Sequence, residues 1–386
     1  MVREIIYELT SHFTARFCFL SSLVGVFKKC YTVNRNVCTY FFVRSREMKK
    51  YLLPEDGEFY KANLHSHSTI SDGCLTPEEM KALYKSRGYR ILAFTDHDSL
   101  VCHNDLTDPD FLVLNGFEVQ IYDLNWPTSR TRKTAHICSI ALDPDTVNQP
   151  CFHRSWYTPN RVRHLISYDE SQPDYVKMYT GEGVSDFMKR SREAGFFVTY
   201  NHPTWSLESY PEYSEYKHMN AMEIYNYSSS TLGFAEYNPR VYDDLLRLGN
   251  RIYCIGSDDN HNAEPPTSPY SDACGAFTMI KAKSLNYKTV TDAMLRGDFY
   301  ASCGPLIHSL VFEDGRVKIT TSPAKRITLE TGVRYASAEH PTTADGFITE
   351  AEFTVLPDCV YFRITVYDEA GKTASTNAYF VDKLFD

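Results

Sequence analysis

Three histidines and several carboxylates fall between Asn63 and Asp98, a stretch that opens with NLHSHSTISDG and closes with RILAFTDHD. His65 and His67 form an HxH pair, and on a strand both imidazoles point to the same side because side chains alternate with period two. The pair can therefore bind one metal ion. Mixed imidazole and carboxylate ligands favour divalent Mn, Fe, Zn or Mg over an all-thiolate zinc site.

Further histidines and carboxylates stand at or just past the ends of apolar, strand-like runs. They are Asp72, His97, Glu118, His202, Asp259 and His261. In parallel α/β folds, functional sites assemble at that edge of the sheet. A lone histidine is usually an ordinary core or surface residue. The joint placement of these side chains nevertheless predicts a metal site.

Two of the candidate ligands leave alternatives open. In GSDDNH, either Asp258 or Asp259 could be the ligand, and the D-x-H spacing favours Asp259. His136 lies in TAHICSIALD, where it is either a ligand or a buried strand histidine.

Strands and helices alternate from Phe59 onward. We expect strands at residues 60–64, 90–94, 111–114, 134–142, 196–200, 219–225, 251–255 and 276–280. We expect helices from Thr76 to about Arg87, and at 184–194, 240–248 and 287–295. Such alternation implies a parallel sheet, either doubly wound or closed as a barrel.

Two segments after residue 59 differ from this pattern. Residues 143–181 lack periodicity and read as an insertion, either a lid over the site or a surface excursion. The basic and aromatic residues of 150–165, Arg161 and Arg163 among them, could form a stacking and phosphate-steering wall. Residues 305–386 show short alternating segments separated by turns, which predicts a small all-β domain of the sandwich type.

Residues 1–47 do not resemble the sequence that follows. Met48 is followed at once by KKYLLPEDGEFYKANLHSH, which leads straight into the first motif. We therefore expect Met48 to be the natural start and residues 1–47 to be a non-native or disordered extension. Residues 48–304 would then form the α/β unit.

The composition narrows the class of protein. A net charge of −9 argues against a broad basic surface for duplex DNA or anionic membrane. The eleven cysteines contain no CxxC pair, which favours reduced thiols over a disulfide framework. No apolar run reaches the roughly 18–20 residues that a spanning helix needs. We expect a cytoplasmic protein with no membrane partner.

The order HSH, SDG, TDHD, a strand-end Glu, AHI, NHP and DDNH closely resembles the PHP (polymerase and histidinol phosphatase) family, in particular its stand-alone metal-dependent phosphoesterases. The resemblance covers roughly Phe59 to Gly304. It implies a distorted seven-stranded β/α barrel, with two or three divalent metal ions at the C-terminal ends of the strands. The metal ligands that it implies are His65, His67, Asp72, His97, Glu118, His136, His202, Asp259 and His261. Asp96 would orient His97 without contacting the metal itself.

The activity that the resemblance implies is hydrolysis of phosphate esters by a metal-activated water, without a covalent protein nucleophile. The expected substrates are nucleotides, other phosphorylated small molecules or short single-stranded nucleic acid ends, the last as in 5′-to-3′ exonuclease activity. Asp98 is a candidate to protonate the leaving group.

Three alternatives remain open. They are a small-molecule phosphatase for sugar or amino-alcohol phosphates, a non-catalytic metal-stabilised scaffold, and an amidohydrolase. The complete ligand set argues against the scaffold. The amidohydrolase is weakened because no lysine at a strand end could be carbamylated to bridge metals.

Overall fold

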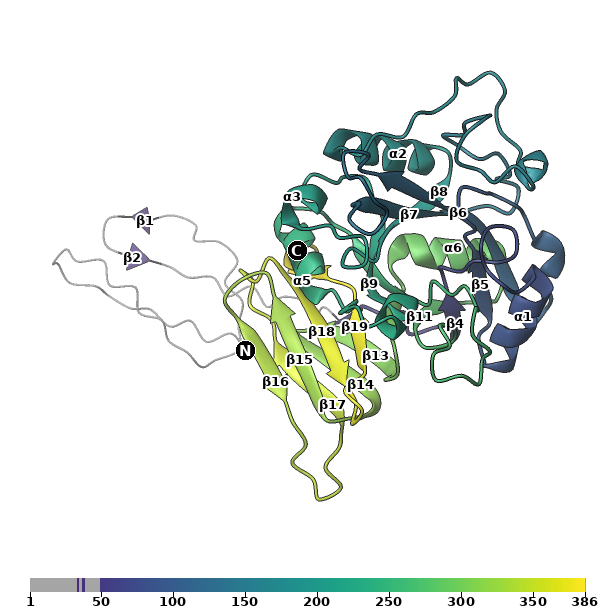
Figure 1. Ribbon diagram of the computed structural model, residues 1–386. Coiled ribbons are helices and arrows are strands. Elements are labelled where there is room, and N and C mark those ends of the chain that lie inside the picture. The colour runs from purple at the N-terminus through teal and green to yellow at the C-terminus, as the bar shows by residue number, and fades with distance from the viewer. Residues whose placement is uncertain (1–32, 35–36, 39–48, 386) are drawn as a thin grey trace.

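The computed structural model describes residues 33–34, 37–38 and 49–385 (Figure 1). From residues 1–47 it describes strands β1 (Val33–Asn34) and β2 (Val37–Cys38), which pair antiparallel. The predictions that residues 1–47 are an extension and that Met48 is the start otherwise lie outside the described residues.

A large mixed sheet forms the body of the protein, with the strand order β10-β9-β8-β7-β6-β5-β4-β11-β12. Its strands are β4 (Glu58–Asn63), β5 (Ile91–Phe94), β6 (Leu112–Tyr122), β7 (Thr134–Ala141), β8 (Phe196–Asn201), β9 (Ala221–Asn226), β10 (Tyr253–Ser257), β11 (Phe277–Ala282) and β12 (Phe299–Ser302). Each of the strands predicted between residues 60 and 280 matches one of β4 to β11. Strand β6 runs further than predicted, so Glu118 lies within it.

Few helices accompany this sheet. They are α1 (Pro77–Ser86), α2 (Gly181–Glu193), α3 (Tyr210–Tyr213), α4 (Tyr227–Thr231), α5 (Pro239–Arg247) and α6 (Tyr287–Arg296), with short 3-10 helices at Asn104–Leu106, Arg163–Leu165 and Val381–Lys383. The Thr76 side chain accepts from the Glu79 N–H, and the Glu79 carboxylate accepts from the Thr76 N–H. This capping box fixes the start of α1. No helix that the structure describes is long and apolar enough to cross a membrane.

The prediction of a parallel sheet is correct for the pairs β4–β5, β5–β6, β8–β9 and β9–β10. It is wrong for strand β7, which runs antiparallel to both β6 and β8. The connection from β6 to β7 is a hairpin loop, closed by a 2.9 Å hydrogen bond from the Asp123 N–H to the Lys133 carbonyl. A hairpin reverses the chain, whereas a parallel pair needs a longer crossover connection. Strand β11 likewise runs antiparallel to β4 and β12.

The two sides of the seven-strand run from β4 to β10 approach each other just past the carboxyl ends of β4 and β10. The His67 N–H donates to the Asn260 carbonyl at 3.1 Å, and the Asp259 N–H donates to the His65 carbonyl at 2.9 Å. Ser66 and Asn260 form a parallel bridge between these contacts. The first and last sequence motifs are therefore neighbours.

The C-terminal region is built of strands, as predicted. They are β13 (Ile307–Glu313), β14 (Arg316–Ala324), β15 (Arg326–Thr331), β16 (Ala336–Glu339), β17 (Ile348–Thr354), β18 (Tyr361–Tyr367), β19 (Thr373–Thr376) and β20 (Tyr379–Phe380). Strands β13, β14 and β17 form a four-stranded sheet with β3 (Lys49–Tyr51), which lies near the other end of the described chain.

The remaining C-terminal strands continue the large sheet. Strand β19 pairs with β12, and β18, β15 and β16 follow it outward (Figure 1). Apolar side chains from both sheets, such as Leu310, Ile319 and Ile364, pack into one buried cluster. The division of the chain at residues 304 and 305 therefore stays a prediction, since the sheet runs through it.

Candidate metal centre

All nine predicted ligands converge beyond the carboxyl end of β4, together with one further carboxylate, Glu223. Their nitrogen and oxygen atoms form four overlapping groups, each within 4.8 Å. The groups are His65, His67, Glu118 and Asp259; His67, Asp72, His97 and His261; His97, Glu118 and His136; and His65, His202 and Glu223. Their role as metal ligands stays a prediction.

All four residues of the first group are buried. His65 Nε2 lies 3.1 Å from Glu118 Oε1 and 3.1 Å from Asp259 Oδ1, and His67 Nε2 lies 3.0 Å from the same Asp259 oxygen. The two Nε2 atoms face each other at 3.2 Å, as the alternation of side chains in HxH predicts. Two imidazoles and two carboxylates thus direct their ligand atoms toward one point.

The second group opens toward solvent through Asp72. Its carboxylate lies 3.6 Å from His97 Nε2 and 3.5 Å from His261 Nε2. The Asp72 side chain is 55% exposed, whereas that of Glu118 is fully buried. A substrate would therefore approach the centre from the side of Asp72.

Three buried atoms at the centre have no hydrogen-bond partner. They are His97 Nδ1, Glu118 Oε2 and His136 Nε2. His97 Nδ1 and Glu118 Oε2 lie 2.9 Å apart without the geometry of a hydrogen bond. Buried polar atoms are nearly always partnered in folded proteins. A shared divalent cation fits this donor set, because imidazole nitrogen and carboxylate oxygen are ligands for such ions.

The structure separates the two neighbouring aspartates of GSDDNH. Asp259 faces His65 and His67, whereas the Asp258 carboxylate accepts from the Tyr84 hydroxyl and the backbone N–H groups of residues 274–276. Asp258 therefore anchors the loop before β11, and Asp259 is the one that joins the cluster, as the spacing predicts.

Asp96 lies behind the first motif rather than under His97. Its carboxylate accepts hydrogen bonds from the backbone N–H and the hydroxyl of both Ser68 and Ser71, at 2.7–3.0 Å. Four donors of one turn are thus satisfied by a single buried carboxylate. Asp96 holds the turn that carries Asp72.

Glu223 is the residue that our reading of the sequence missed. It lies in β9, is fully buried, and accepts from His65 Nδ1 at 2.9 Å and from the His202 N–H at 3.1 Å. A carboxylate on the remote ring nitrogen fixes the tautomer and orientation of a ligand histidine. The signal in the sequence was a glutamate inside the apolar strand AMEIYN.

Asp98, the candidate acid, is not part of the four groups. Its carboxylate pairs with the buried ammonium of Lys177, which comes from the insertion and also donates to the Gln120 carbonyl at 2.9 Å. Asp98 has a φ of +50°, and Asp259 has a φ of +57°. Non-glycine residues in this region are strained, and such strain concentrates at functional sites.

The insertion contacts the motif loops directly. The Arg161 guanidinium donates to the carbonyls of Ile70 and Ser71, and the Thr158 hydroxyl donates to the Asp98 carbonyl at 2.6 Å. The insertion therefore lies against the metal centre. A phosphate-steering role for Arg161 stays a prediction, and its guanidinium already has two backbone acceptors.

The histidines of the cluster divide into two electrostatic classes. Burial lowers the pKa of His67 to about 3 and that of His136 to about 4, so both are held neutral. Burial also lowers the pKa of His202, but Glu118 and Asp259 outweigh it and raise the pKa to about 9. The pKa of the Glu118 carboxyl lies well below its usual range, against the effect of burial, because of His65 and His136.

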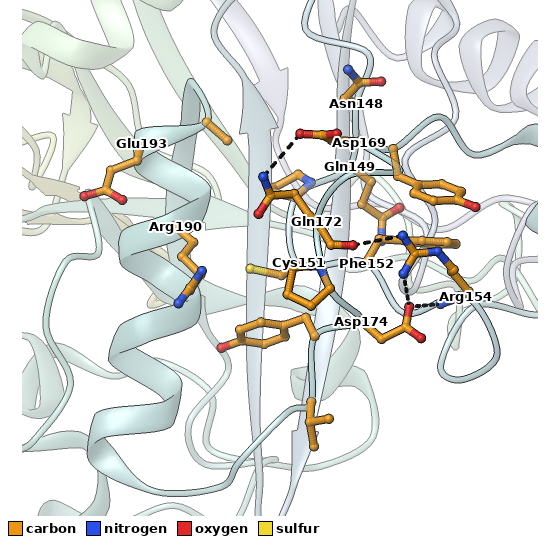
Figure 2. Close-up of a pocket in the computed structure, with 16 residues that line it drawn as sticks. Asn148, Gln149, Cys151, Phe152, Arg154, Asp169, Gln172, Asp174, Arg190 and Glu193 are labelled. Atoms are coloured by element: carbon orange, nitrogen blue, oxygen red, sulfur yellow. Dashed lines mark hydrogen bonds and ion pairs between the residues drawn. The ribbon is translucent and has the colours of Figure 1, made fainter.

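A cavity of about 590 Å³ lies on another side of the insertion (Figure 2). Its walls are residues 148–152, 154, 168–169 and 172–176 and the end of α2, including Arg190 and Glu193. None of the predicted ligands lines it. This cavity is therefore distinct from the metal centre.

We compared the chain with known proteins. No family model matches it. A 3′,5′-nucleoside bisphosphate phosphatase from Chromobacterium violaceum is 36% identical over 89 residues, which cover 21% of this chain and 28% of that protein. The match thus spans less than a third of the length of this relative.

Two solved structures also resemble the chain. A two-domain protein from Bacteroides vulgatus, described as containing a predicted PHP-like metal-dependent phosphoesterase, is 14% identical, with a TM-score of 0.41 over 83% of this chain and 94% of its own. The resemblance to the PHP family is confirmed by the sequence match to the nucleoside bisphosphate phosphatase. An amidohydrolase from Chromobacterium violaceum is 16% identical, with a TM-score of 0.30 over 52% of this chain and 87% of its own. The expected enzyme class, a hydrolase of phosphoric esters, is the class of that phosphatase.

Proposed function

We propose that this protein is a metal-dependent phosphoesterase of the PHP type. The observation that carries the proposal is the set of three buried, unpartnered atoms of His97, Glu118 and His136, at a point where nine predicted ligands converge. The ligands would be those nine residues. When two or three divalent ions are bound, the site gains the Lewis-acid chemistry that activates water and offsets phosphate charge.

The surrounding residues of the chain prepare the site for this reaction. Glu223 holds Nδ1 of His65, so Nε2 faces Glu118 and Asp259. Asp96 fixes the turn that places Asp72 at the open side. The centre is therefore preorganised on its buried side and accessible to solvent on the side of Asp72.

The proposed substrates are nucleotides or short oligonucleotides. A curated relative acts on nucleoside bisphosphates, and the acidic net charge of −9 disfavours long duplexes. We also propose that the protein acts as an exonuclease on the oligonucleotides and that it is located in the cytoplasm. A sugar-phosphate or amino-alcohol phosphatase is the less favoured alternative, because no observation on this chain points to it.

We propose that the fold is a distorted seven-stranded barrel. The parallel bridge between Ser66 and Asn260 supports this proposal, since it brings the end of β10 beside the end of β4. The antiparallel β7 is the distortion.

The test combines elemental analysis with turnover. Purified protein is supplied with manganese and offered bis-p-nitrophenyl phosphate, a nucleoside bisphosphate and a 5′-phosphorylated RNA oligomer. We expect two or more metals per chain and hydrolysis that His65→Ala abolishes, while His308→Ala, which alters an exposed histidine of β13, retains it. Protein that holds metal but hydrolyses none of these esters would refute the proposal.

A further inference from the structure

Trp205 lies beside the metal centre and is open to solvent. Its ring centroid is 5.2 Å from that of His136 and 5.2 Å from that of His202, and 36% of the residue is exposed. The rings meet at 68° and 88°, so neither imidazole stacks on a face of the indole. Tryptophan is highly buried on average. An exposed indole that touches two predicted ligands therefore calls for a functional reason.

The backbone around the indole is held rigidly. The N–H groups of Thr204 and Trp205 donate to the two oxygens of the Glu236 carboxylate, at 3.2 and 2.8 Å. Glu236 is 1% exposed, and the Glu208 N–H closes the turn on the Pro203 carbonyl at 3.1 Å. A side chain on such a turn presents a fixed surface, and its ordering on binding costs little entropy.

The neighbouring strands extend a surface from the centre toward the indole. Glu118, Gln120 and Tyr122 alternate along β6, so their side chains share one face of the sheet. Thr134 on β7 is opposite Tyr122, and its N–H donates to the Ser206 carbonyl at 3.2 Å. The residue that follows the indole is thus tied to the strand pair that carries Glu118.

We propose that Trp205 is the platform on which a planar ring of the substrate stacks while the phosphate occupies the metal centre. The inference rests on the proposed phosphoesterase function and names the part of the substrate that the protein selects, a nucleobase or comparable aromatic group. Stacking of a base on an aromatic side chain contributes about 1–3 kcal/mol, or roughly 5- to 150-fold in affinity. A sugar phosphate without a base would lack this contribution.

The test compares adenosine 5′-monophosphate with ribose 5-phosphate, which has the same phosphate and sugar but no base. KM and kcat are measured for both, and Kd is measured by calorimetry for their hydrolysis-resistant 5′-phosphonate analogues. We expect Trp205→Ala to raise KM and Kd for the adenosine compounds about 5- to 150-fold, and to leave the ribose compounds unchanged. Trp205→Phe should restore most of the preference. Trp126→Ala is the matched control, since Trp126 is an exposed tryptophan, at 44%, in the loop between β6 and β7.

Each outcome decides the inference. Equal losses for both ligands in Trp205→Ala would mean that the indole only packs the ligand histidines, and would overturn it. Unchanged affinity, or an equal effect of Trp126→Ala, would overturn it as well. If the wild type binds the adenosine analogue preferentially through Trp205 but hydrolyses neither these two esters nor the three esters of the metal test above, the platform stands and the phosphoesterase proposal fails.

Discussion

Glu223 and His65 are joined side chain to side chain, with the carboxylate Oε1 2.9 Å from the imidazole Nδ1, and both residues are fully buried. The same carboxylate also accepts from the Ser257 hydroxyl and the His202 N–H. The buried Glu223 carboxylate therefore orients the ring of His65 and the backbone of His202, another predicted ligand.

We predict that Glu223→Gln lowers manganese affinity about 10- to 100-fold, the usual cost of losing an outer-shell carboxylate partner. The amide is nearly isosteric but no longer charged, so it holds the His65 tautomer less firmly. Metal titration by calorimetry measures the change. Glu208→Gln is the control, because Glu208 is also a buried carboxylate but is bonded to tyrosines rather than to the cluster. Unchanged affinity in Glu223→Gln would contradict the role.

Removal of metal should lower thermal stability. A ligand present at about 100 times its Kd contributes about 2.7 kcal/mol to the folded state. We therefore expect a chelator to lower Tm by a few degrees and excess manganese to restore it. Scanning calorimetry measures the shift. His65→Ala should respond less than the wild type, and a chelator that moves neither protein would argue against a metal centre.

The pair of Lys177 and Asp98 should hold the insertion against the strands of the large sheet. Both side chains are nearly inaccessible, at 7% and 11% exposed. Lys177→Met leaves the Asp98 carboxylate buried without a partner, which costs about 3–5 kcal/mol for a buried pair. We expect faster proteolysis within residues 143–181, measured by limited digestion.

The double variant Lys177→Met/Asp98→Asn is the control for this pair. It removes both charges, so it should recover part of the lost resistance. Equal digestion of the wild type and Lys177→Met would show that the pair does not anchor the insertion.

Glu208 should make stability depend on pH. Its carboxyl is buried among Tyr200, Tyr216 and Tyr179, and burial raises its pKa from 4.5 to about 7, against the effect of these hydroxyls. Above pH 4.5 the unfolded chain loses a proton that the folded protein keeps. The free energy of unfolding therefore falls as pH rises to about 7, by about 3 kcal/mol in total, and then levels off.

Denaturant unfolding between pH 4.5 and 8 measures this dependence. Glu208→Gln has no carboxyl to titrate, so we expect its stability to vary less over this interval. A variant with the same slope as the wild type would exclude Glu208 as the source.

The sequence predicted most of what local patterns determine. Thr76 and Glu79 marked the start of α1 because a capping box is a local structure, and histidines at strand ends pointed to the centre because such ends share one edge of a sheet. The reversal of β7 was missed, since apolar alternation carries no information on strand direction. Glu223 was missed because one glutamate in a strand has meaning only through its partner 158 positions away.

The pairing of β12 with β19 has a consequence for how this protein can evolve. Asn377, just past β19, donates to the carbonyls of Gly297 and Phe299 and accepts from the Cys254 N–H. The last residues of the chain thus complete backbone hydrogen bonding around β10 and β12. A gene fragment that ended after the last PHP-like motif would encode a sheet with an open, adhesive edge. Recombination should therefore transmit residues 58–302 of the large sheet together with the C-terminal strands that complete it.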